Sequence, residues 1–321
     1  MKENSFAFFS GTSHPKLAGD ICEILACKPS KLHISTFPDG ETFCQVQENV
    51  RGKDTFLLQS LALNPNQYLM ELFVLVDALK RASAKSIVAI LPYYAYCRQD
   101  RKDQPRVPIT AKLVADLLQK AGIDQVLTLD LHTSQVQGFF DAPLDNLQAR
   151  VIFRDILSRE ISSDFVVVSP DIGSIKLARA YASDLQRDFA VVDKIRKSAE
   201  HTQAAQLMGS VEGRDILLVD DMCSTGGTLA MAAELCKEKG ARHIYAVLTH
   251  ALFVGPAFRN IAKSPIKKIW VSDSVARDFS KIYLNIETVS VAPLIAESVR
   301  CVLEGRSISS LFRPLRQAIS I

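Results

Sequence analysis

The fold is decided by one stretch of the sequence, Ile216-Leu217-Leu218-Val219-Asp220-Asp221-Met222-Cys223-Ser224-Thr225-Gly226-Gly227-Thr228. The apolar run over 216–219 predicts a strand, and the small residues over 224–228 predict a tight turn into a helix. A strand that passes through a short turn into a helix is the repeating unit of α/β proteins. The stretch therefore predicts an α/β fold with a mostly parallel sheet.

Alternating strands and helices extend from this stretch toward both ends of the chain. Short β-branched or aromatic runs predict further strands over 6–9, 32–36, 55–59, 86–91, 125–129, 165–168, 188–192, 243–249 and 267–271. Stretches with helical spacing predict helices over 15–26, 67–82, 109–121, 149–158, 172–183 and 226–239. We expect two sheets of similar size, the first of them built from the five strands up to residue 129.

The length of 321 residues exceeds what one hydrophobic core usually serves, so we expect two domains. The turn-rich stretch over 143–149 marks the seam between them. We expect one α/β domain over 1–146 and a second over 147–292. A C-terminal helix and tail over 293–321 is expected to pack back on the N-terminal domain.

Composition excludes several classes of protein. Hydrophobic residues make up 48% of the chain and charged residues 23%, which excludes disorder, collagen and coiled coil. The formal net charge of +3 is too balanced for a nucleic-acid binder recognised by bulk charge, so any anion site must be local.

The cysteines and the apolar runs bear on the compartment. Seven scattered cysteines without a C-x-x-C pair argue against a disulfide framework or a zinc site, and we expect a reducing cytoplasm. No uninterrupted run of about 18 apolar residues occurs, so we expect no membrane span. The absence of G-x-x-x-x-G-K-[ST] excludes a P-loop kinase.

The turn after the strand over 216–219 has the composition of an anion cradle. Gly226 and Gly227 allow a ligand to approach the backbone, and a helix N-terminus offers N–H groups to a phosphate. Ser224, Thr225 and Thr228 add hydroxyl groups, while Asp220 and Asp221 suit the vicinal hydroxyls of a sugar. The alternative is an ordinary capped turn, but two adjacent carboxylates gain nothing there from packing.

Four other polar segments follow expected strands, and each could be either part of a ligand site or an ordinary structural feature. The segment Phe37-Pro38-Asp39-Gly40-Glu41 could stack on a purine or be a plain turn. Arg98, Gln99, Arg101 and Lys102 could receive a polyphosphate, with Gln99 free to hydrogen-bond a base, or be a solvated charge run. His132 with Asp130 could hold a divalent ion, or the histidine could be structural. Asp171 could be a second metal ligand or a helix N-cap.

Two cations follow the expected strand over 188–192. Lys194 and Arg196 open the aperiodic polar stretch 197–203, which we interpret as a mobile loop. Cations on a closing loop could stabilise the charge that develops in phosphoryl transfer. A surface hairpin with incidental charge is the alternative.

Together these motifs resemble a known family. The stretch over 220–228 resembles the phosphoribosyl diphosphate motif shared by type I phosphoribosyltransferases and ribose-phosphate diphosphokinases. The segments over 37–41, 96–102, 130–141 and 192–196 resemble the diphosphokinases alone, in the same order along nearly the whole chain. The resemblance implies two similar doubly wound domains of the type I phosphoribosyltransferase kind, the first on the ATP side and the second binding the ribose phosphate.

The resemblance also implies an activity and a role for each residue. The family transfers the diphosphoryl group of ATP to the 1-hydroxyl of ribose 5-phosphate, giving phosphoribosyl diphosphate and AMP. It uses Mg2+ and acts as a homo-oligomer, by family resemblance a hexamer, without nucleic acid or membrane partners. The implied roles are catalysis by Lys194 and Arg196; ATP binding by Phe37, Asp39, Gly40, Glu41, Arg98, Gln99, Asp100 and Arg101; ribose 5-phosphate binding by Arg196, Asp220, Asp221, Ser224, Thr225, Gly226, Gly227 and Thr228; and metal binding by His132, Asp171 and Asp130.

The chain departs from the family pattern at several positions. Residues 172–174 replace a histidine and paired glycines, Ile195 replaces an arginine, 197–203 replace an Arg/Pro-rich loop, and Ser224 replaces an aspartate. Two rival functions follow. One is a phosphoribosyltransferase, which would not need the segments over 37–41 and 98–102. The other is a catalytically silent regulatory homologue, against which the intact Lys194 and Arg196 speak.

Overall fold

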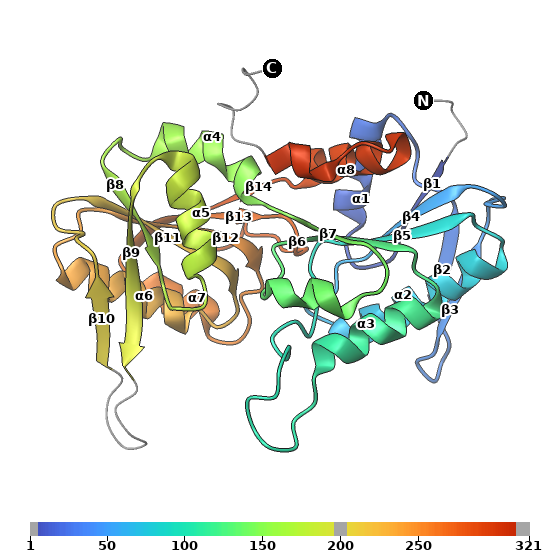
Figure 1. Cartoon of the computed structure of the whole chain (residues 1–321), viewed down its shortest axis with the longest axis horizontal. Coiled ribbons are helices and arrows are strands. Elements are labelled where there is room, and N and C mark those ends of the chain that lie inside the picture. The colour runs from blue at the N-terminus through green and yellow to red at the C-terminus, as the bar shows by residue number, and fades with distance from the viewer. Residues whose placement is uncertain (1–5, 196–203, 313–321) are drawn as a thin grey trace. The chain divides into compact units, whose positions relative to one another are not determined.

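The computed structural model describes residues 6–195 and 204–312 of the chain, which divide into two compact units (Figure 1). The described residues of unit 1 are 6–148, 274–276 and 290–312. Those of unit 2 are 149–195, 204–273 and 277–289. The expected boundary at 292–293 therefore differs from the observed division, because the chain returns to unit 1 twice in its last fifty residues.

Unit 1 is built on a five-stranded parallel sheet. Its strands carry nearly uninterrupted apolar runs, such as those over 56–58 and 87–91, whose side chains are buried. Such runs fit a parallel sheet that is covered on both faces. The strand order is β1 (Phe6–Ser10), β4 (Asp54–Leu58), β5 (Ser86–Leu91), β6 (Gln125–Leu129) and β7 (Leu144–Leu147).

The described helices of unit 1 are α1 (Pro15–Leu25), α2 (Pro65–Arg81), α3 (Thr110–Ala121) and α8 (Ala292–Glu304), with the 3-10 helices η1 (Ser134–Phe139) and η2 (Ile308–Phe312). Figure 1 shows α1 and α8 on one side of the sheet and α2 and α3 on the other. Proline occupies the first turn of α1, α2 and α8, where its missing N–H costs no hydrogen bond. Arg300 Nη2 of α8 donates to Ile24 O of α1 at 2.6 Å, so the C-terminal helix packs within unit 1.

A separate antiparallel hairpin joins unit 1. It consists of β2 (Leu32–Thr36) and β3 (Thr42–Val46), and Cys44 Sγ contacts Val74 O of α2 at 3.6 Å. The prediction that 32–36 belongs to the main sheet is wrong, because its fifth strand is β7 in the stretch expected to be a turn. The sequence Leu-Asp-Asn-Leu does not predict this strand, because two of its four side chains are polar. In the structure the polar side chains are hydrogen-bonded: Asn146 Oδ1 accepts Leu131 N–H at 3.0 Å.

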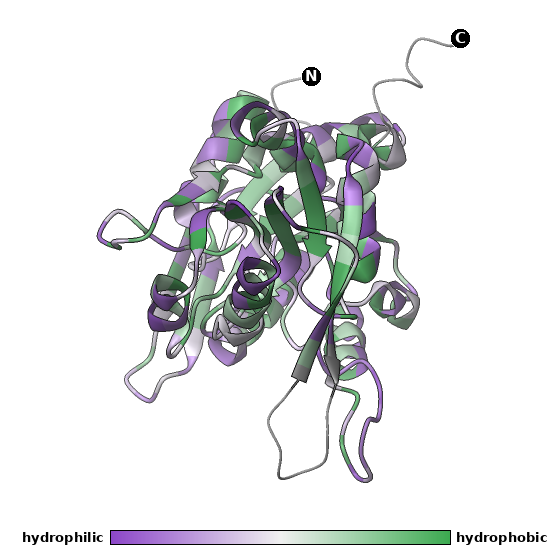
Figure 2. Cartoon of the chain, turned by 90° about the vertical axis from the view of Figure 1, so that its left-hand side faces the viewer, coloured by the Kyte–Doolittle hydropathy of each residue, from purple (hydrophilic) through white to green (hydrophobic). Residues whose placement is uncertain are grey.

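Unit 2 is built on a seven-stranded sheet in which only one edge strand is antiparallel. The order is β10 (Ala204–Met208), β9 (Asp188–Ile195), β8 (Phe165–Ser169), β11 (Asp215–Cys223), β12 (Ile244–Ala251), β13 (Ile266–Ser272) and β14 (Ile286–Val289). Figure 2 shows apolar residues concentrated in these strands. The strands β3, β10 and β14 were not expected from the sequence, because they are short and only half-buried or carry polar residues.

Helices cover both faces of the sheet in unit 2. They are α4 (Arg150–Glu160), α5 (Ile175–Leu185), α6 (Gly227–Glu238) and α7 (Ala257–Lys263), of which α7 was not expected. Val166, Ile216 and Leu218 pack with α6 and α7 in one core cluster, while α5 contacts β8 and β11. Burial on both faces explains the continuous apolar run over 216–219.

The strand order of unit 2 reverses at one point. From β8 the chain moves to β9 on one side, whereas β11 lies on the other side of β8 and continues to β12, β13 and β14. In open α/β sheets, ligands bind outside the carboxyl ends of the strands at such a switch point. The loops after β8 and β11 are therefore the place to seek a ligand site in this unit.

Two absences can be stated for the described part of the chain. None of its helices is both long and apolar enough to cross a membrane. All seven cysteines lie in that part, and none of them forms a disulfide.

Candidate functional site

Asp220 and Asp221 lie at the carboxyl end of β11, beside the switch point. The prediction that the strand ends before them is wrong: β11 continues to Cys223, and Met222 pairs with His250 of β12. Beyond Leu218 no pairing with β8 is present, so the two carboxylates lie where β11 leaves its neighbour on that side.

The turn after β11 is fixed by its neighbours. Ser224 O accepts Val254 N–H at 2.8 Å, and Thr225 O accepts Asn260 Nδ2 of α7 at 2.9 Å. Gly226 has φ +75°, and a Cβ at this position would approach both Ala257 O and the Ile261 side chain to 3.2 Å. Only glycine fits both the left-handed backbone and the close approach of α7.

The N-terminus of α6 follows this turn at once. Its first N–H groups have no acceptor within the helix and suit an anion. Thr225 and Gly227 are exposed, and Ser224 and Thr228 are half-buried. The structure therefore brings together the five residues of the predicted phosphate cradle with the two carboxylates of β11.

Asp171 lies in the neighbouring loop, between β8 and α5. Its Oδ1 accepts Gly173 N–H at 2.9 Å and Ser174 N–H at 3.3 Å. These two bonds form a turn in the loop before α5, which begins at Ile175 rather than at 172. The N-cap of α5 is Ser174, so Asp171 is not the helix N-cap that the sequence left open as an alternative. One carboxylate oxygen of Asp171 is thus engaged with the loop backbone.

The carboxylates of β11 and of the β8–α5 loop affect the pKa of Asp220. Burial, followed by the nearby Asp221 carboxylate, raises the pKa of Asp220 well above its ordinary value, and Asp171 raises it further. A bound cation or a set of hydroxyl donors would offset this repulsion. Among residues 6–195 and 204–312, however, no three His, Cys, Asp or Glu side chains form a group that could hold a metal ion by themselves.

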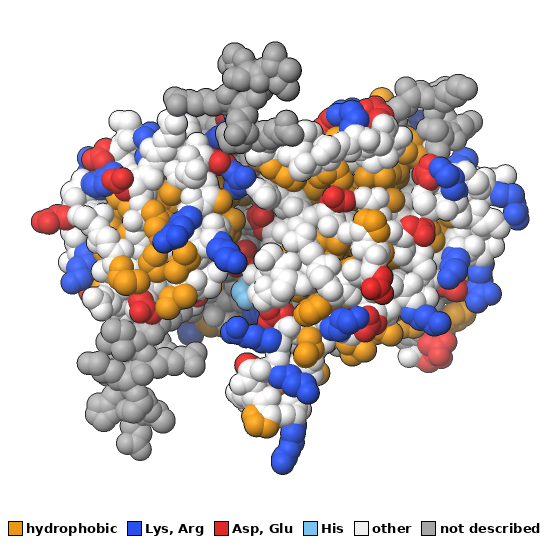
Figure 3. All heavy atoms as spheres, viewed as in Figure 1, with side chains coloured by type: hydrophobic (Ala, Val, Ile, Leu, Met, Phe, Trp, Pro, Cys, Tyr) orange, Lys and Arg blue, Asp and Glu red, His pale blue; other side chains and the backbone are white. Residues whose placement is uncertain are grey.

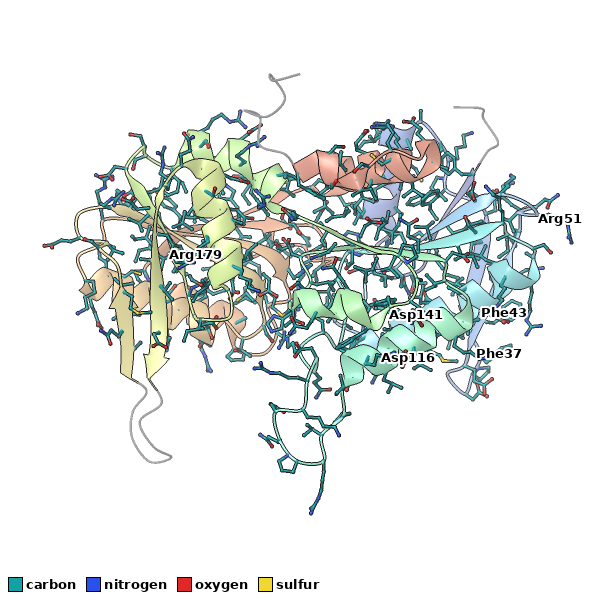
Figure 4. The ribbon with its side chains drawn as sticks, in the orientation of Figure 1. Phe37, Phe43, Arg51, Asp116, Asp141 and Arg179 are labelled. Atoms are coloured by element: carbon teal, nitrogen blue, oxygen red, sulfur yellow. The ribbon has the colours of Figure 1, made fainter. Side chains whose placement is uncertain are left out.

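In unit 1, the segment over 37–41 forms the tip of the β2–β3 hairpin. Phe37 is 49% exposed, and its ring meets the Phe43 ring edge-to-face at 5.8 Å between centroids. Figure 4 labels both residues. Asp39 Oδ1 accepts Glu41 N–H at 3.2 Å, and Gly40 has φ +98°. The backbone over 37–41 thus forms a turn, as one of the two interpretations expected. The turn leaves the Phe37 ring half exposed at the tip of the hairpin.

The loop between β5 and α3 carries the predicted cation cluster. Figures 1 and 3 show it extending from the body of unit 1 with Lys and Arg side chains along it. Arg98 and Arg101 are exposed. Gln99 and Asp100 are anchored, because Gln99 Oε1 accepts Thr110 Oγ1–H at 2.5 Å and Asp100 Oδ2 accepts Gln135 Nε2–H at 2.6 Å.

Asp130 and His132 follow β6, also in unit 1. Asp130 is buried with φ +31°, and its N–H donates to Leu147 O at 2.9 Å. His132 is exposed. Asp171 belongs to unit 2, so the metal site composed of these three residues stays a prediction.

Two matches to family models cover most of the chain. Residues 6–122 match the N-terminal domain of ribose phosphate pyrophosphokinase, and residues 203–313 match the phosphoribosyl synthetase-associated domain. The ribose-phosphate pyrophosphokinase of Wolinella succinogenes is 45% identical over 307 residues, which cover 96% of this chain and 99% of the relative. The chain belongs to the ribose-phosphate pyrophosphokinase family.

Two further relatives agree with this membership. The ribose-phosphate pyrophosphokinase of Rhodopirellula baltica is 46% identical over 308 residues, covering 95% of this chain and 98% of the relative. The crystal structure of phosphoribosylpyrophosphate synthetase from Mycobacterium smegmatis has a TM-score of 0.89 at 38% identity, covering 94% of this chain and all of that one. The expected α/β fold class and the family resemblance are confirmed.

Membership also bears on the rival functions and on the remaining site residues. A phosphoribosyltransferase is not favoured, because the pyrophosphokinase relatives match over nearly the full length.

Lys194 lies in β9, where its backbone is paired with Ala205 of β10. Arg196 and the expected loop over 197–203 lie outside the described residues. Ser174 and Asn260 had no role predicted from the sequence; Ser174 contacts Asp220, and Asn260 contacts the turn before α6.

Proposed function

We propose that this chain transfers the diphosphoryl group of ATP to the 1-hydroxyl of ribose 5-phosphate, giving 5-phosphoribosyl 1-diphosphate and AMP. Membership of the ribose-phosphate pyrophosphokinase family supports this reaction. Phosphoryl transfer needs little covalent chemistry from the protein, since positioning and charge neutralisation supply most of the rate.

One observation carries the sugar-phosphate half of the proposal. The turn from β11 to α6 offers acceptors and donors side by side: the Asp220 and Asp221 carboxylates precede a glycine turn held against α7, and the N–H groups of α6 follow it. A ribose 5-phosphate has the complementary arrangement, with hydroxyl donors on the ring and a dianion at one end. We propose that Ser224–Thr228 hold the 5-phosphate and the two aspartates hold the ribose hydroxyls.

The ATP half is assigned to unit 1. We propose that the exposed ring of Phe37 stacks on the adenine, with Asp39, Gly40 and Glu41 at the same hairpin tip, and that Arg98 and Arg101 bind the polyphosphate. Gln99 and Asp100 hold the shape of that loop through Thr110 and Gln135. Lys194 and Arg196 are assigned to the charge that develops in the transition state.

The residues assigned to the metal must offer the ligand atoms that Mg2+ prefers. Mg2+ prefers oxygen ligands and is commonly held by one or two carboxylates together with substrate phosphates. Asp171, Asp220 and Asp221 do not form a metal-binding group by themselves, but their mutual repulsion raises the pKa of Asp220 and would be relieved by a cation held together with substrate phosphates. We therefore propose Mg2+ bound between Asp171 and the substrate phosphates, with Asp130 and His132 on the ATP side. The ion would neutralise phosphate charge when bound.

The remaining assignments rest on the family resemblance. We propose that the chain acts in the cytoplasm as a homo-oligomer, by that resemblance a hexamer.

The test is the identity of the product. The purified chain is incubated with ATP, ribose 5-phosphate and Mg2+, and AMP and ADP are separated and quantified. We expect AMP to form in equal amount with phosphoribosyl diphosphate, because β- and γ-phosphoryl groups leave together. ADP as the nucleotide product would contradict the proposal, and no turnover would favour the silent regulatory homologue.

A further inference from the structure

A serine hydroxyl of the loop between β8 and α5 donates a hydrogen bond to a carboxylate of β11. Ser174 is buried, with 8% of its surface exposed, and its Oγ donates to Oδ1 of Asp220. The two residues are 46 positions apart, so this bond ties the β8–α5 loop to strand β11 beside the switch point of unit 2. Nothing in the assigned reaction has yet used this contact.

The capping arrangement explains why the hydroxyl is available. Ser174 occupies the N-cap position of α5, where a serine side chain ordinarily accepts an N–H from the first turn of the helix. Its side chain makes no such bond. Asp171 instead accepts the N–H groups of Gly173 and Ser174, at 2.9 and 3.3 Å. Asp171 thus holds the loop backbone just before α5, and the Ser174 hydroxyl donates to Asp220 instead of capping the helix.

The hydroxyl restricts how the Asp220 carboxylate can turn. Oδ1 also accepts the N–H of Asp221, at 3.0 Å. Two donors from different directions, one from the strand itself and one from the β8–α5 loop, hold the same oxygen. The carboxylate plane is thereby fixed relative to β11, whereas the Asp221 N–H alone would allow rotation about the side-chain bonds.

We propose that Ser174 is a positioning residue for ribose 5-phosphate, holding the Asp220 carboxylate in the orientation that accepts the sugar hydroxyls. This inference rests on the proposed function of the β11–α6 turn and extends it to a residue outside that turn.

The experiment compares two variants that lack the hydroxyl with one that keeps it. We expect Ser174→Ala to raise KM for ribose 5-phosphate about tenfold, as lost hydrogen bonds to charged groups do, while KM for ATP changes less than about twofold. Ser174→Gly, which keeps an acceptable N-cap, should behave alike. Ser174→Thr should stay close to the unsubstituted chain, because it retains the donor.

The control and a double variant separate positioning from general stability. Ser298 of α8 is fully buried, and its Oγ donates to Leu294 O at 2.8 Å, so Ser298→Ala removes a comparable hydroxyl away from the site. It should lower Tm without changing either KM. In an Asp220→Ala background, Ser174→Ala should add less than about twofold to KM for ribose 5-phosphate, because the hydroxyl acts through that carboxylate.

Several results would overturn the inference. Unchanged KM for ribose 5-phosphate in Ser174→Ala and Ser174→Gly, an equal rise in KM for ATP, or a full additional effect in the Asp220→Ala background would each show that the Ser174 hydroxyl does not position the Asp220 carboxylate. A Ser174→Thr variant as impaired as Ser174→Ala would do the same. An unsubstituted chain that forms no AMP would instead refute the proposed function itself.

Discussion

At the scale of single residues, Asp215 shows how a buried carboxylate stabilises unit 2. It begins β11, at the opposite end of the strand from Asp220, and only 3% of it is exposed. Ser162 Oγ and Arg242 Nε each donate to it at 2.8 Å, and His243 Nδ1 lies 3.0 Å from it. Burial raises the pKa of Asp215, but the hydrogen bonds from Arg242 and Ser162 outweigh burial and lower it below the ordinary value.

This environment predicts a pH-dependent loss of stability. Asp215→Asn should lower Tm at pH 7, because Ser162 and Arg242 lose a charged acceptor that is only 3% exposed. A carboxyl with a lowered folded-state pKa contributes fully above its unfolded value of about 3.9, and the contribution is lost as the pH falls through the folded value. The Tm difference between the two proteins should therefore shrink at pH values below about 4.

The control for this prediction is a carboxylate of the same unit on the surface. Asp188 accepts Arg214 Nη1 at 2.6 Å, but its side chain is 73% exposed. Asp188→Asn should change the free energy of unfolding by less than about 1 kcal/mol. A Tm difference for Asp215→Asn that stays constant between pH 7 and pH 3 would contradict the assigned role of the carboxylate.

Residue roles were only partly predictable from the sequence. Adjacent aspartates before a glycine turn have no packing use, so Asp220 and Asp221 could be assigned to a ligand site in advance. Asp171 could not be resolved, because a carboxylate before a helix suits a cap and a ligand equally well. Ser174 gave no signal, since its partner lies 46 residues away and a serine at a helix start is ordinary.

At the scale of elements, the α6 turn depends on Gly226. Gly226→Ala should lower Tm and raise KM for ribose 5-phosphate at least tenfold, because its Cβ meets Ala257 O and forces the turn away from α7. Gly213 provides a matched control: it has φ +71° with open space around it, so Gly213→Ala should cost only about 1 kcal/mol of backbone strain. Steady-state kinetics and thermal unfolding measure both effects.

The KM values and the Tm of Gly226→Ala can contradict the role assigned to the contact with α7. A Gly226→Ala protein with the KM values of the Gly213→Ala protein would show that the turn does not need its contact with α7 to bind the sugar phosphate. Loss of stability alone, equal in the two variants, would leave backbone strain as the whole role of the glycine.

Long apolar elements were predictable, and short ones were not. The expected strand over 86–91 agrees with β5, and the helix over 109–121 agrees with α3 within one residue, because each carries a strong periodic signal. The strand β7 is only four residues long with two polar side chains, and β14 is similarly short. Their pairing comes from neighbours distant in sequence, which local patterns do not contain.

At the scale of the whole chain, the division into two units separates the two predicted half-sites. The β11–α6 turn and Asp171 belong to unit 2, whereas the β2–β3 hairpin and the β5–α3 loop belong to unit 1. The sequence predicted which residues gather within each half, since each set follows a single strand or turn.

Initial-rate kinetics of one variant in each unit test the assignment of the two halves. Asp221→Asn should raise KM for ribose 5-phosphate at least tenfold and leave KM for ATP within about twofold. Arg98→Ala should show the reverse, because its exposed guanidinium is assigned to the polyphosphate of ATP. If either variant raises both KM values equally, or if the two effects are exchanged, the assignment of ribose phosphate to unit 2 and ATP to unit 1 is contradicted.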